Sequence, residues 1–566
     1  MKKLQIKHLY TEEGETLSGT PWNVYPRPQL IRDSFFCLNG EWSFYEYEGT
    51  SEEKITVPFP PESLLSKINR RLNKAPKPVY KKAFTLPKDF IKDKVILHFG
   101  AVDQLATVFL NGKRIGSHVG GYESFCFDIT DAVKNDNLLE VQITDELQSK
   151  VHPYGKQREK RGGMWYTPIT GIWQTVWIES VPSEYVEALT VKTGADYADI
   201  FVSGVAQGEI TVTLPDGELT VPFENGHAYI KLDKPKMWSP ESPYLYYFSL
   251  KTEYDEVLSY FAIRTLETKT VNGIPRLCLN GEPYFFHGVL DQGYFSDGIF
   301  TPATENGYEK DILAMKSLGF NTLRKHIKVE PERFYYDCDR LGMIVFQDMV
   351  NNGSYSFLRD TALPTLGLKK LPDRFLHRNS LAREAFKNGM ISTVKQLFNH
   401  PCICYWTVFN EGWGQFESAK MYEFMKTLDN SRFIDTASGW FTGAQSNVTS
   451  LHVYFKPVKL KASSLPIVLT EFGGYVYKDI EHSFNLDKTY GYKIFENQAD
   501  FEDALEELYL KEVVPNIKKG LCGAIYTQLS DVEDETNGLL TYDRKVVKVN
   551  ADRMKKLADM LKIEND

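Results

Sequence analysis

The sequence predicts a multidomain protein in which two all-β domains precede a (β/α)8, or TIM, barrel. A chain of 566 residues is too long for one hydrophobic core and suggests roughly three or four domains. In the first half, short β-rich runs are separated by Gly, Asn, Asp and Pro, with no long amphipathic helix. Beyond about residue 280, apolar strands alternate with helical patterns, which indicates a parallel sheet.

The first half divides into two predicted β domains. Residues 1–182 fit a β-sandwich of the jelly-roll type. Residues 183–268 form a shorter β segment with a turn at Pro215-Asp216-Gly217, and this size and turn spacing suit an immunoglobulin-like sandwich. Residues 269–566 are then assigned to the barrel.

The barrel segment contains eight candidate strands, which is the number that a TIM barrel requires. Helices are recognisable between some of them, for instance over Tyr308–Leu318, where apolar residues recur at helical spacing. The strand candidates are 284–288, 322–325, 343–348, 402–410, 433–436, 448–454, 467–471 and 523–529.

Two of these strands deliver a glutamate to the end of the barrel. Glu411 follows one apolar run, and Glu471 ends another just before two glycines. Burial raises the pKa of a carboxyl, which suits a general acid, and we predict this role for Glu411. Retaining glycoside hydrolysis needs two facing carboxylates, and Glu471 would be the nucleophile. Either glutamate alone is more simply a cap or an ion-pair partner, but the pair favours catalysis.

Motifs along nearly the whole chain resemble those of the family 2 glycoside hydrolases, which include β-galactosidases, β-glucuronidases and β-mannosidases. Besides the two glutamates, they are Leu38–Trp42, Val57–Ser63, Val108–Gly112, His118–Tyr122, Tyr166–Trp177 and Asp531–Leu540. The resemblance implies an N-terminal sugar-binding domain, and a barrel with the acid/base on strand four and the nucleophile on strand seven. It also implies that Asn410 hydrogen-bonds the sugar 2-hydroxyl, although by itself Asn410 would be read as a strand-end turn.

Other side chains at predicted strand ends are candidate sugar contacts. Arg324 is the candidate for keeping Glu471 ionised, because a nearby cation favours a carboxylate. His326 is explained equally well as a structural histidine. Aromatic faces stack on pyranose rings, but Trp413 and Trp440 could equally pack at the barrel rim. The remaining candidates are Asp291, His287, Gln292, His452 and Tyr454.

The sequence after the last strand favours a neutral sugar. The β-glucuronidases carry an Asn-x-Lys pair there that binds the uronate carboxylate, whereas this chain has Asn537 and no lysine. Glu533, Asp534 and Glu535 precede it, and an acidic rim would repel a uronate.

The predicted function is therefore an exo-acting, retaining β-glycosidase of the β-galactosidase type that acts on a glycoside or oligosaccharide. No catalytic metal or other cofactor is expected, because Asn352 and Ser354 stand where magnesium-dependent β-galactosidases have a Glu and a His. The alternatives are β-glucuronidase or β-mannosidase activity, and a non-catalytic carbohydrate-binding protein on the same scaffold. The sequence leaves open whether the protein forms a homo-oligomer.

Composition excludes several other classes. The net charge of −9 argues against a nucleic-acid partner, and the basic run Lys156–Arg161 is explained most simply as a solvated loop. Seven cysteines, with Cys402 and Cys404 in a predicted strand, support neither a disulfide framework nor a zinc site. Reduced thiols fit a cytoplasmic protein. Met1 is not followed by an apolar segment, and no run is apolar enough to span a membrane.

Overall fold

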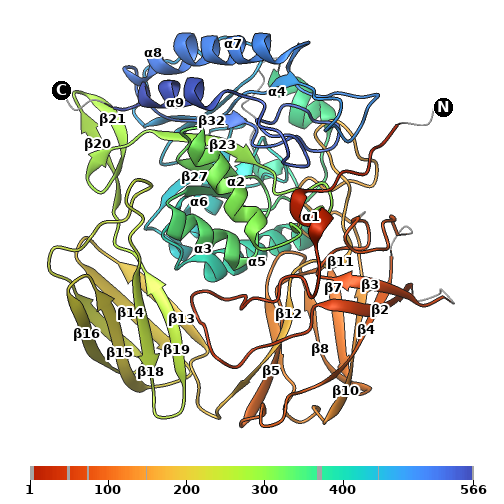
Figure 1. Ribbon diagram of the computed structural model, residues 1–566. Coiled ribbons are helices and arrows are strands. Elements are labelled where there is room, and N and C mark those ends of the chain that lie inside the picture. The colour runs from red at the N-terminus through yellow and green to blue at the C-terminus, as the bar shows by residue number, and fades with distance from the viewer. Residues whose placement is uncertain are drawn as a thin grey trace.

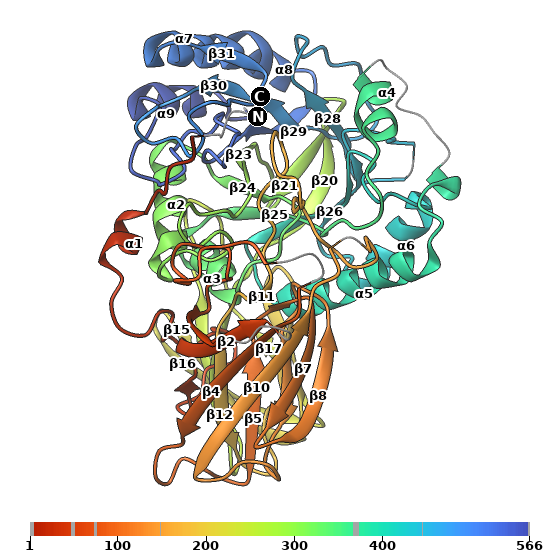
Figure 2. The ribbon, with the colours of Figure 1, turned by 90° about the vertical axis from the view of Figure 1, so that its right-hand side faces the viewer.

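The computed structural model describes residues 5–46, 51–72, 76–147, 149–365, 373–443 and 445–563. A barrel surrounded by helices lies above two β-rich regions in Figure 1. The N-terminal segment does not pack only on the first β region. Its short helix α1 (Glu12–Thr16) lies beside the barrel in both ribbon views (Figure 2), and the backbone N–H of Thr11 donates a 2.9 Å hydrogen bond to Asp297.

The first β region is a sandwich of antiparallel sheets. A four-stranded sheet has the order β1-β12-β5-β9, a six-stranded sheet has the order β3-β2-β4-β10-β7-β8, and β11 pairs with β6. Leu97 and Phe99 of the first sheet share one core with Tyr80 and Val141 of the second. The strands are β1 (Phe36–Cys37), β2 (Gly40–Glu46), β3 (Glu53–Val57), β4 (Pro78–Thr85), β5 (Lys94–Phe99), β6 (Val102–Asp103), β7 (Leu105–Leu110), β8 (Lys113–Val119), β9 (Phe125–Asp128), β10 (Asp136–Thr144), β11 (Gly171–Ile172) and β12 (Val176–Val181).

The second β region has seven antiparallel strands in the order β13-β14-β17-β16-β15-β18-β19 and a separate core that includes Ile200, Ile210 and Phe248. Its immunoglobulin-like classification and the domain boundaries at 182/183 and 268/269 stay predictions. The strands are β13 (Ala188–Thr193), β14 (Tyr197–Ser203), β15 (Gln207–Leu214), β16 (Gly217–Glu224), β17 (His227–Lys231), β18 (Tyr246–Lys251) and β19 (Glu256–Phe261), followed by a three-stranded sheet of β20 (Leu266–Val271), β21 (Ile274–Leu279) and β22 (Glu282–Pro283).

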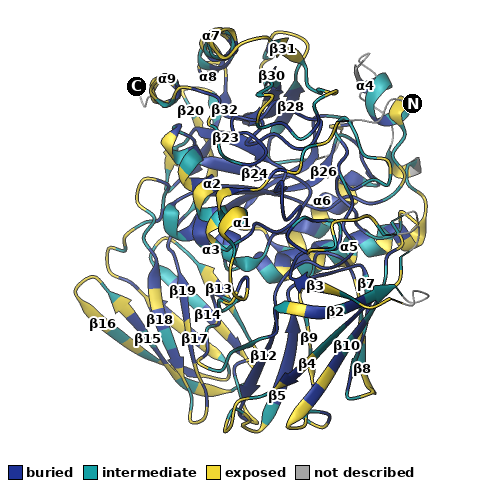
Figure 3. Cartoon of the chain, turned by 45° about the vertical axis from the view of Figure 1, so that its right-hand side comes forward, coloured by how far each residue is buried: buried dark blue, intermediate teal, exposed yellow. Residues whose placement is uncertain are grey.

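The expected eight-stranded barrel is confirmed. Its strands are parallel and almost entirely buried, as Figure 3 shows, because helices cover the outside and side chains fill the inside. The order is β27-β26-β25-β24-β23-β32-β29-β28, and the Ser450 hydroxyl of β28 bonds to Asp435 of β27 at 3.0 Å where the two end strands meet. The strands are β23 (Phe286–Asp291), β24 (Thr322–Lys325), β25 (Ile344–Asp348), β26 (Ile403–Asn410), β27 (Phe433–Ser438), β28 (Thr449–Val453), β29 (Ile467–Gly473) and β32 (Leu521–Thr527).

The predicted helix over Tyr308–Leu318 is present as α2 (Asn306–Ser317), which buries Ile312 and Met315. Among the described residues, no helix is both long and apolar enough to cross a lipid bilayer, and all seven cysteines are free thiols. The other elements of this part are α3 (Glu332–Leu341), α4 (Leu363–Thr365), α5 (Ser380–Leu397), α6 (Ser418–Leu428), β30 (Tyr475–Tyr477), β31 (Lys493–Phe495), α7 (Gln498–Leu508), α8 (Val514–Ile517) and α9 (Ala551–Asp559), with π-helical turns at Leu358–Ala362 and Tyr509–Val513 and a 3₁₀ turn at Asp373–Phe375.

A segment of the first β region, residues 154–166, reaches the carboxyl-terminal end of the barrel, and we call it the strap. The N–H of Tyr154 donates to the carbonyl of Asn351 at 3.0 Å, and the ring of Trp165 lies 5.1 Å from that of Trp413. The expectation of a solvated loop is wrong for Lys156 and Gln157, whereas the rest of the basic run is partly or fully exposed. Lys156 is buried and Lys160 is the exposed residue of the basic run, because the strap packs against barrel loops that lie far away in the sequence.

Candidate active site

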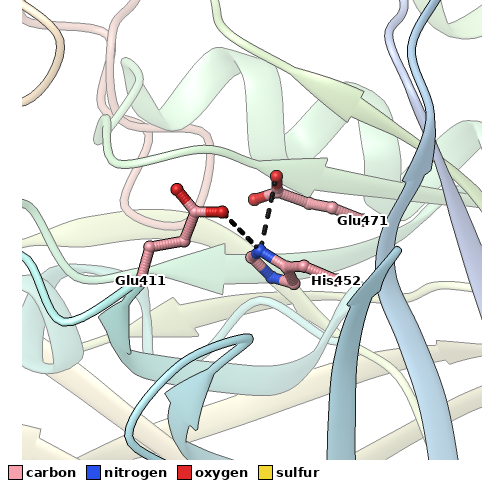
Figure 4. Close-up of side chains that lie close together, drawn as sticks. All are labelled: Glu411, His452 and Glu471. Atoms are coloured by element: carbon pink, nitrogen blue, oxygen red, sulfur yellow. Dashed lines mark hydrogen bonds and ion pairs between the residues drawn. The ribbon is translucent and has the colours of Figure 1, made fainter. Parts of the chain in front are cut away.

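Glu411 stands at the carboxyl end of β26 on a left-handed turn. Its φ is 49° and that of Gly412 is 75°, and its N–H donates to the carbonyl of Ser438 in β27 at 2.9 Å. A non-glycine residue in this conformation carries backbone strain of about 1–3 kcal/mol, which persists at sites where the surrounding structure enforces it. In Figure 4 the side chain of Glu411 extends toward His452 and Glu471.

Glu471, in β29, is held as a carboxylate. Arg324 Nη1 donates to its Oε1 at 3.0 Å, and the hydroxyl of Tyr454 donates to its Oε2. Burial by itself would raise the pKa of Glu471, but the electrostatic interactions with His452 and Arg324, together with the Tyr454 hydrogen bond, lower it to about 2. This side chain is therefore ionised throughout the neutral range.

His452 joins the two glutamates. Its Nδ1 lies 2.8 Å from Oε1 of Glu411 and 3.6 Å from Oε2 of Glu471, as the dashed lines in Figure 4 mark. One oxygen of each glutamate and an imidazole nitrogen lie within 4.8 Å of one another. Two carboxylates and an imidazole also form a donor set that suits Zn²⁺, and within the described residues this group has the composition and spacing to hold a metal ion.

Arg324 lies at the base of the site and forms hydrogen bonds to several of its side chains. Its fully buried guanidinium bonds to Asp348 Oδ1 at 3.0 Å and to Asn410 Oδ1 at 2.8 Å, besides Glu471. The amide oxygen of Asn410 is therefore occupied, whereas its buried Nδ2 has no hydrogen-bond partner among the described residues. An unpaired buried donor is costly, so Asn410 is positioned to donate to a bound molecule.

Aromatic side chains border the two glutamates. Tyr454 stacks on Tyr492 with ring centroids 3.9 Å apart, and the ring of Trp440 lies 5.8 Å from that of His452. Trp413, in the turn after Glu411, packs against the strap rather than against β26 alone. Trp413 is buried and so belongs to the packing of the barrel rim, whereas Tyr454, Tyr492 and Trp440 are partly exposed and provide flat apolar surfaces of the kind on which sugars stack.

Other predicted contacts lie outside this group. Asp291 is engaged in a separate buried ion cluster, where Lys325 Nζ approaches its Oδ2 at 2.6 Å. Burial would raise the pKa of Asp291, but the charge of Lys325 lowers it. His287 faces Tyr509 instead, with Nε2 3.0 Å from its hydroxyl. His326 forms a 2.8 Å hydrogen bond through Nδ1 to Asp348. Hydrogen bonds connect it to Glu471 through Asp348 and Arg324.

The acids after the last strand do not form a bare acidic rim, which corrects that part of the sequence argument. Glu533 and Asp534 are buried and paired with Arg161 of the strap at 3.4 and 2.9 Å. Glu535 accepts hydrogen bonds from Tyr166 and, at 3.2 Å, from Asn537. Repulsion of an anionic sugar by these acids is therefore weaker than their sequence suggests.

Sequence reasoning missed three residues at or beside this group: Asp348, Tyr492 and Lys156. Asp348 ends a predicted strand just as the two glutamates do, and that signal could have identified it. Tyr492, which stacks on Tyr454, lies in an irregular loop between β30 and β31 that has no periodic pattern. Lys156 belongs to another β region, and no spacing along the chain connects it with the barrel.

Two family models match the chain. One is described as "Glycosyl hydrolases family 2, TIM barrel domain" and covers residues 272–465, and the other, "Glycosyl hydrolase 2 galactose-binding domain-like", covers residues 62–181. The chain belongs to glycoside hydrolase family 2. The family models match the barrel as far as β28, short of β29 and β32, and the greater part of the first β region.

Curated relatives are distant and longer. A β-galactosidase of Thermoanaerobacter pseudethanolicus is 26% identical over 62% of this chain and 47% of its own length. A β-glucuronidase of Bacteroides fragilis is 24% identical over 66% of this chain and 56% of its own length. The chain thus spans about half the length of these relatives.

Solved structures share the fold over nearly the whole chain. A β-D-glucuronidase of Dictyoglomus thermophilum has a TM-score of 0.74 at 17% identity, covering 94% of this chain and 98% of that one. A β-galacturonidase of Eisenbergiella tayi has a TM-score of 0.69 at 19% identity with the same coverage of 94% and 98%. At such identities the likeness supports the arrangement of domains.

Proposed function

We propose that the chain is a retaining, exo-acting β-glycosidase that releases a terminal β-linked sugar by double displacement. The observation that carries this proposal is the separation of Glu411 and Glu471, whose nearest oxygens lie within 4.8 Å. Retaining enzymes hold their carboxyl groups about 5 to 5.5 Å apart, whereas inverting enzymes need about 6.5 to 9.5 Å to admit a water molecule.

In the first step, a carboxylate oxygen of Glu471 attacks the anomeric carbon while the bond to the leaving oxygen breaks. Glu411 gives its proton to that oxygen. In the second step, Glu411 takes a proton from water, the water oxygen bonds to the anomeric carbon, and Glu471 leaves as a carboxylate. Asn410 donates through its free Nδ2 to the 2-hydroxyl, and Arg324 keeps the nucleophile charged between turnovers.

Two sugar classes remain candidates. A neutral sugar, as in a β-galactosidase, is favoured by Asn537, since no lysine stands where the β-glucuronidase motif has one. A uronate is favoured by the pairing of Glu533 and Asp534 with Arg161 and by the unpaired ammonium of Lys156. β-Mannosidase activity and carbohydrate binding without catalysis are the remaining alternatives.

The test is a panel of p-nitrophenyl β-glycosides, followed by NMR of the first-formed product. Turnover with release of the β-anomer supports a retaining β-glycosidase. Initial release of the α-anomer would overturn the double displacement. Sugar binding with no turnover of any β-glycoside would leave the non-catalytic alternative.

A further inference from the structure

One buried cation beside the site lacks a partner. The side chain of Lys156 is only 7% exposed, and its Nζ makes no hydrogen bond or ion pair with any residue in the described part of the chain. The buried lysines of the barrel differ, since Lys325 lies 2.6 Å from Asp291 and Lys548 lies 2.7 Å from Asp531. Among the described residues no carboxylate pairs directly with this ammonium, and Glu535 interacts with it only at longer range. A buried ammonium without a direct partner is unfavourable, so this charge fits an anion that binds beside it.

The position of Lys156 is fixed by the strap. Its ammonium lies 4.8 Å from the centre of a Trp413 ring, in the turn that follows Glu411. Trp413 also packs on Trp165, so two residues of the strap contact this indole of the barrel. This cation–π contact orients the ammonium but does not neutralise it.

The charge of Lys156 contributes to the pKa shifts of two side chains near Glu471, namely those of Glu535 and His326. Burial raises the pKa of Glu535, and Lys156 opposes that rise, while the charge of Glu471 adds to it. Burial lowers the pKa of His326, and Lys156 lowers it further. The Trp413 ring that Lys156 contacts lies 6.5 Å from the ring of His326. Glu535 and His326 each interact with Glu471, so Lys156 lies on the side of the barrel end where the sugar would sit.

We propose that Lys156 binds the carboxylate of a terminal β-linked uronic acid, so that the first β region supplies the specificity of the barrel site. This inference rests on the proposed glycosidase function and names its substrate class. An ammonium offers three donors and a point charge, and a carboxylate satisfies both, whereas a neutral hydroxyl would leave the buried charge uncompensated.

Asn537, which matches the asparagine of the β-glucuronidase Asn-x-Lys motif, is not free to bind a uronate carboxylate. Asn537 accepts a 2.9 Å hydrogen bond from Gln528 and donates to Glu535 at 3.2 Å, so its amide is already engaged inside the barrel loop. A cation from the strap would therefore replace a cation from the loop after β32, reaching the sugar from the opposite domain.

The experiment compares the wild type with Lys156→Met, Lys156→Arg and the matched control Lys160→Met. Lys160 lies on the same strap but is exposed. Each protein is assayed on p-nitrophenyl β-D-glucuronide and β-D-galacturonide and on the matching neutral glucoside and galactoside. We expect the uronide-to-neutral ratio of kcat/KM to fall at least about tenfold in Lys156→Met, mainly through KM, to recover partly in Lys156→Arg, and to stay unchanged in Lys160→Met.

If kcat/KM falls equally on uronides and neutral sugars in Lys156→Met, the lysine only packs the strap. If kcat/KM does not change on either class, Lys156 does not bind the substrate. Both outcomes would overturn the inference and leave the glycosidase proposal in place. If the wild type hydrolyses none of the substrates, the proposed function fails, and calorimetric binding of free D-glucuronate and D-galacturonate decides the inference separately. Uronate binding that Lys156→Met abolishes would support it. Absence of uronate binding by the wild type would overturn it.

Discussion

Nδ1 of His452 lies 2.8 Å from Oε1 of Glu411. The same nitrogen is 3.6 Å from Glu471, so a single imidazole links the proposed acid to the proposed nucleophile. One ring nitrogen carries at most one proton, and it can donate a strong hydrogen bond to one glutamate at a time. A sugar bound between the two carboxylates would therefore change which of them accepts the hydrogen bond from His452.

Glu471→Gln should abolish turnover and leave the fold intact. The amide has nearly the shape of the carboxylate but cannot attack the anomeric carbon, so we expect kcat to fall by at least about 10⁴-fold. Glu471→Ala should be partly rescued by azide, with a glycosyl azide of inverted configuration as product. Near wild-type rates in Glu471→Gln, with an unchanged melting temperature, would contradict the nucleophile assignment.

Glu411→Ala should affect substrates according to their leaving groups. Poor leaving groups need a proton, so their kcat/KM should fall by about 10²- to 10⁴-fold, while an activated aryl glycoside such as the dinitrophenyl derivative loses far less in the glycosylation step. The measurement is a plot of log kcat/KM against leaving-group pKa. An equal loss across the whole series would assign Glu411 a structural role.

The acid limb of the pH profile should respond to Tyr454→Phe. The pKa of Glu471 is about 2, below its ordinary value, so the active carboxylate is present above that ordinary value and is lost only as pH falls through about 2. Removing the Tyr454 hydroxyl raises the pKa of Glu471, and we expect kcat/KM at pH 4 to 5 to fall more than at pH 7. Tyr229→Phe, at an exposed tyrosine of the second β region, is the control. An identical profile in Tyr454→Phe would show that this hydrogen bond does not tune Glu471.

Zn²⁺ should inhibit competitively. Glu411, His452 and Glu471 place three donor atoms within 4.8 Å, which suits a tetrahedral ion and would occupy the place of the reacting sugar. Inhibition should be relieved by EDTA and weakened in His452→Ala, with residual activity toward an activated substrate as the readout. Equal inhibition of His452→Ala and the wild type would place the ion elsewhere.

The sequence by itself predicted the barrel, its eight strands and the position of two glutamates at the ends of two of them. A TIM barrel encodes each strand as a short apolar run, and a charge at the end of such a run stands out, as at Glu411 and Glu471. The family motifs that point to the same fold are also local. Asp348 belongs with these signals, because it too ends an apolar strand.

Only the tertiary structure decided which polar residues meet. Asp291 follows one predicted strand and Arg324 lies at the end of the next, yet Asp291 pairs with Lys325 and Arg324 with Glu471. Arg324 and Lys325 are consecutive residues of β24, and consecutive side chains of a strand point to opposite faces. Lys156 looked solvated in the sequence and is buried in the structure. Its surroundings come from Trp413 and other barrel residues far away along the chain, and no pattern of spacing can register a contact that forms only when two domains pack.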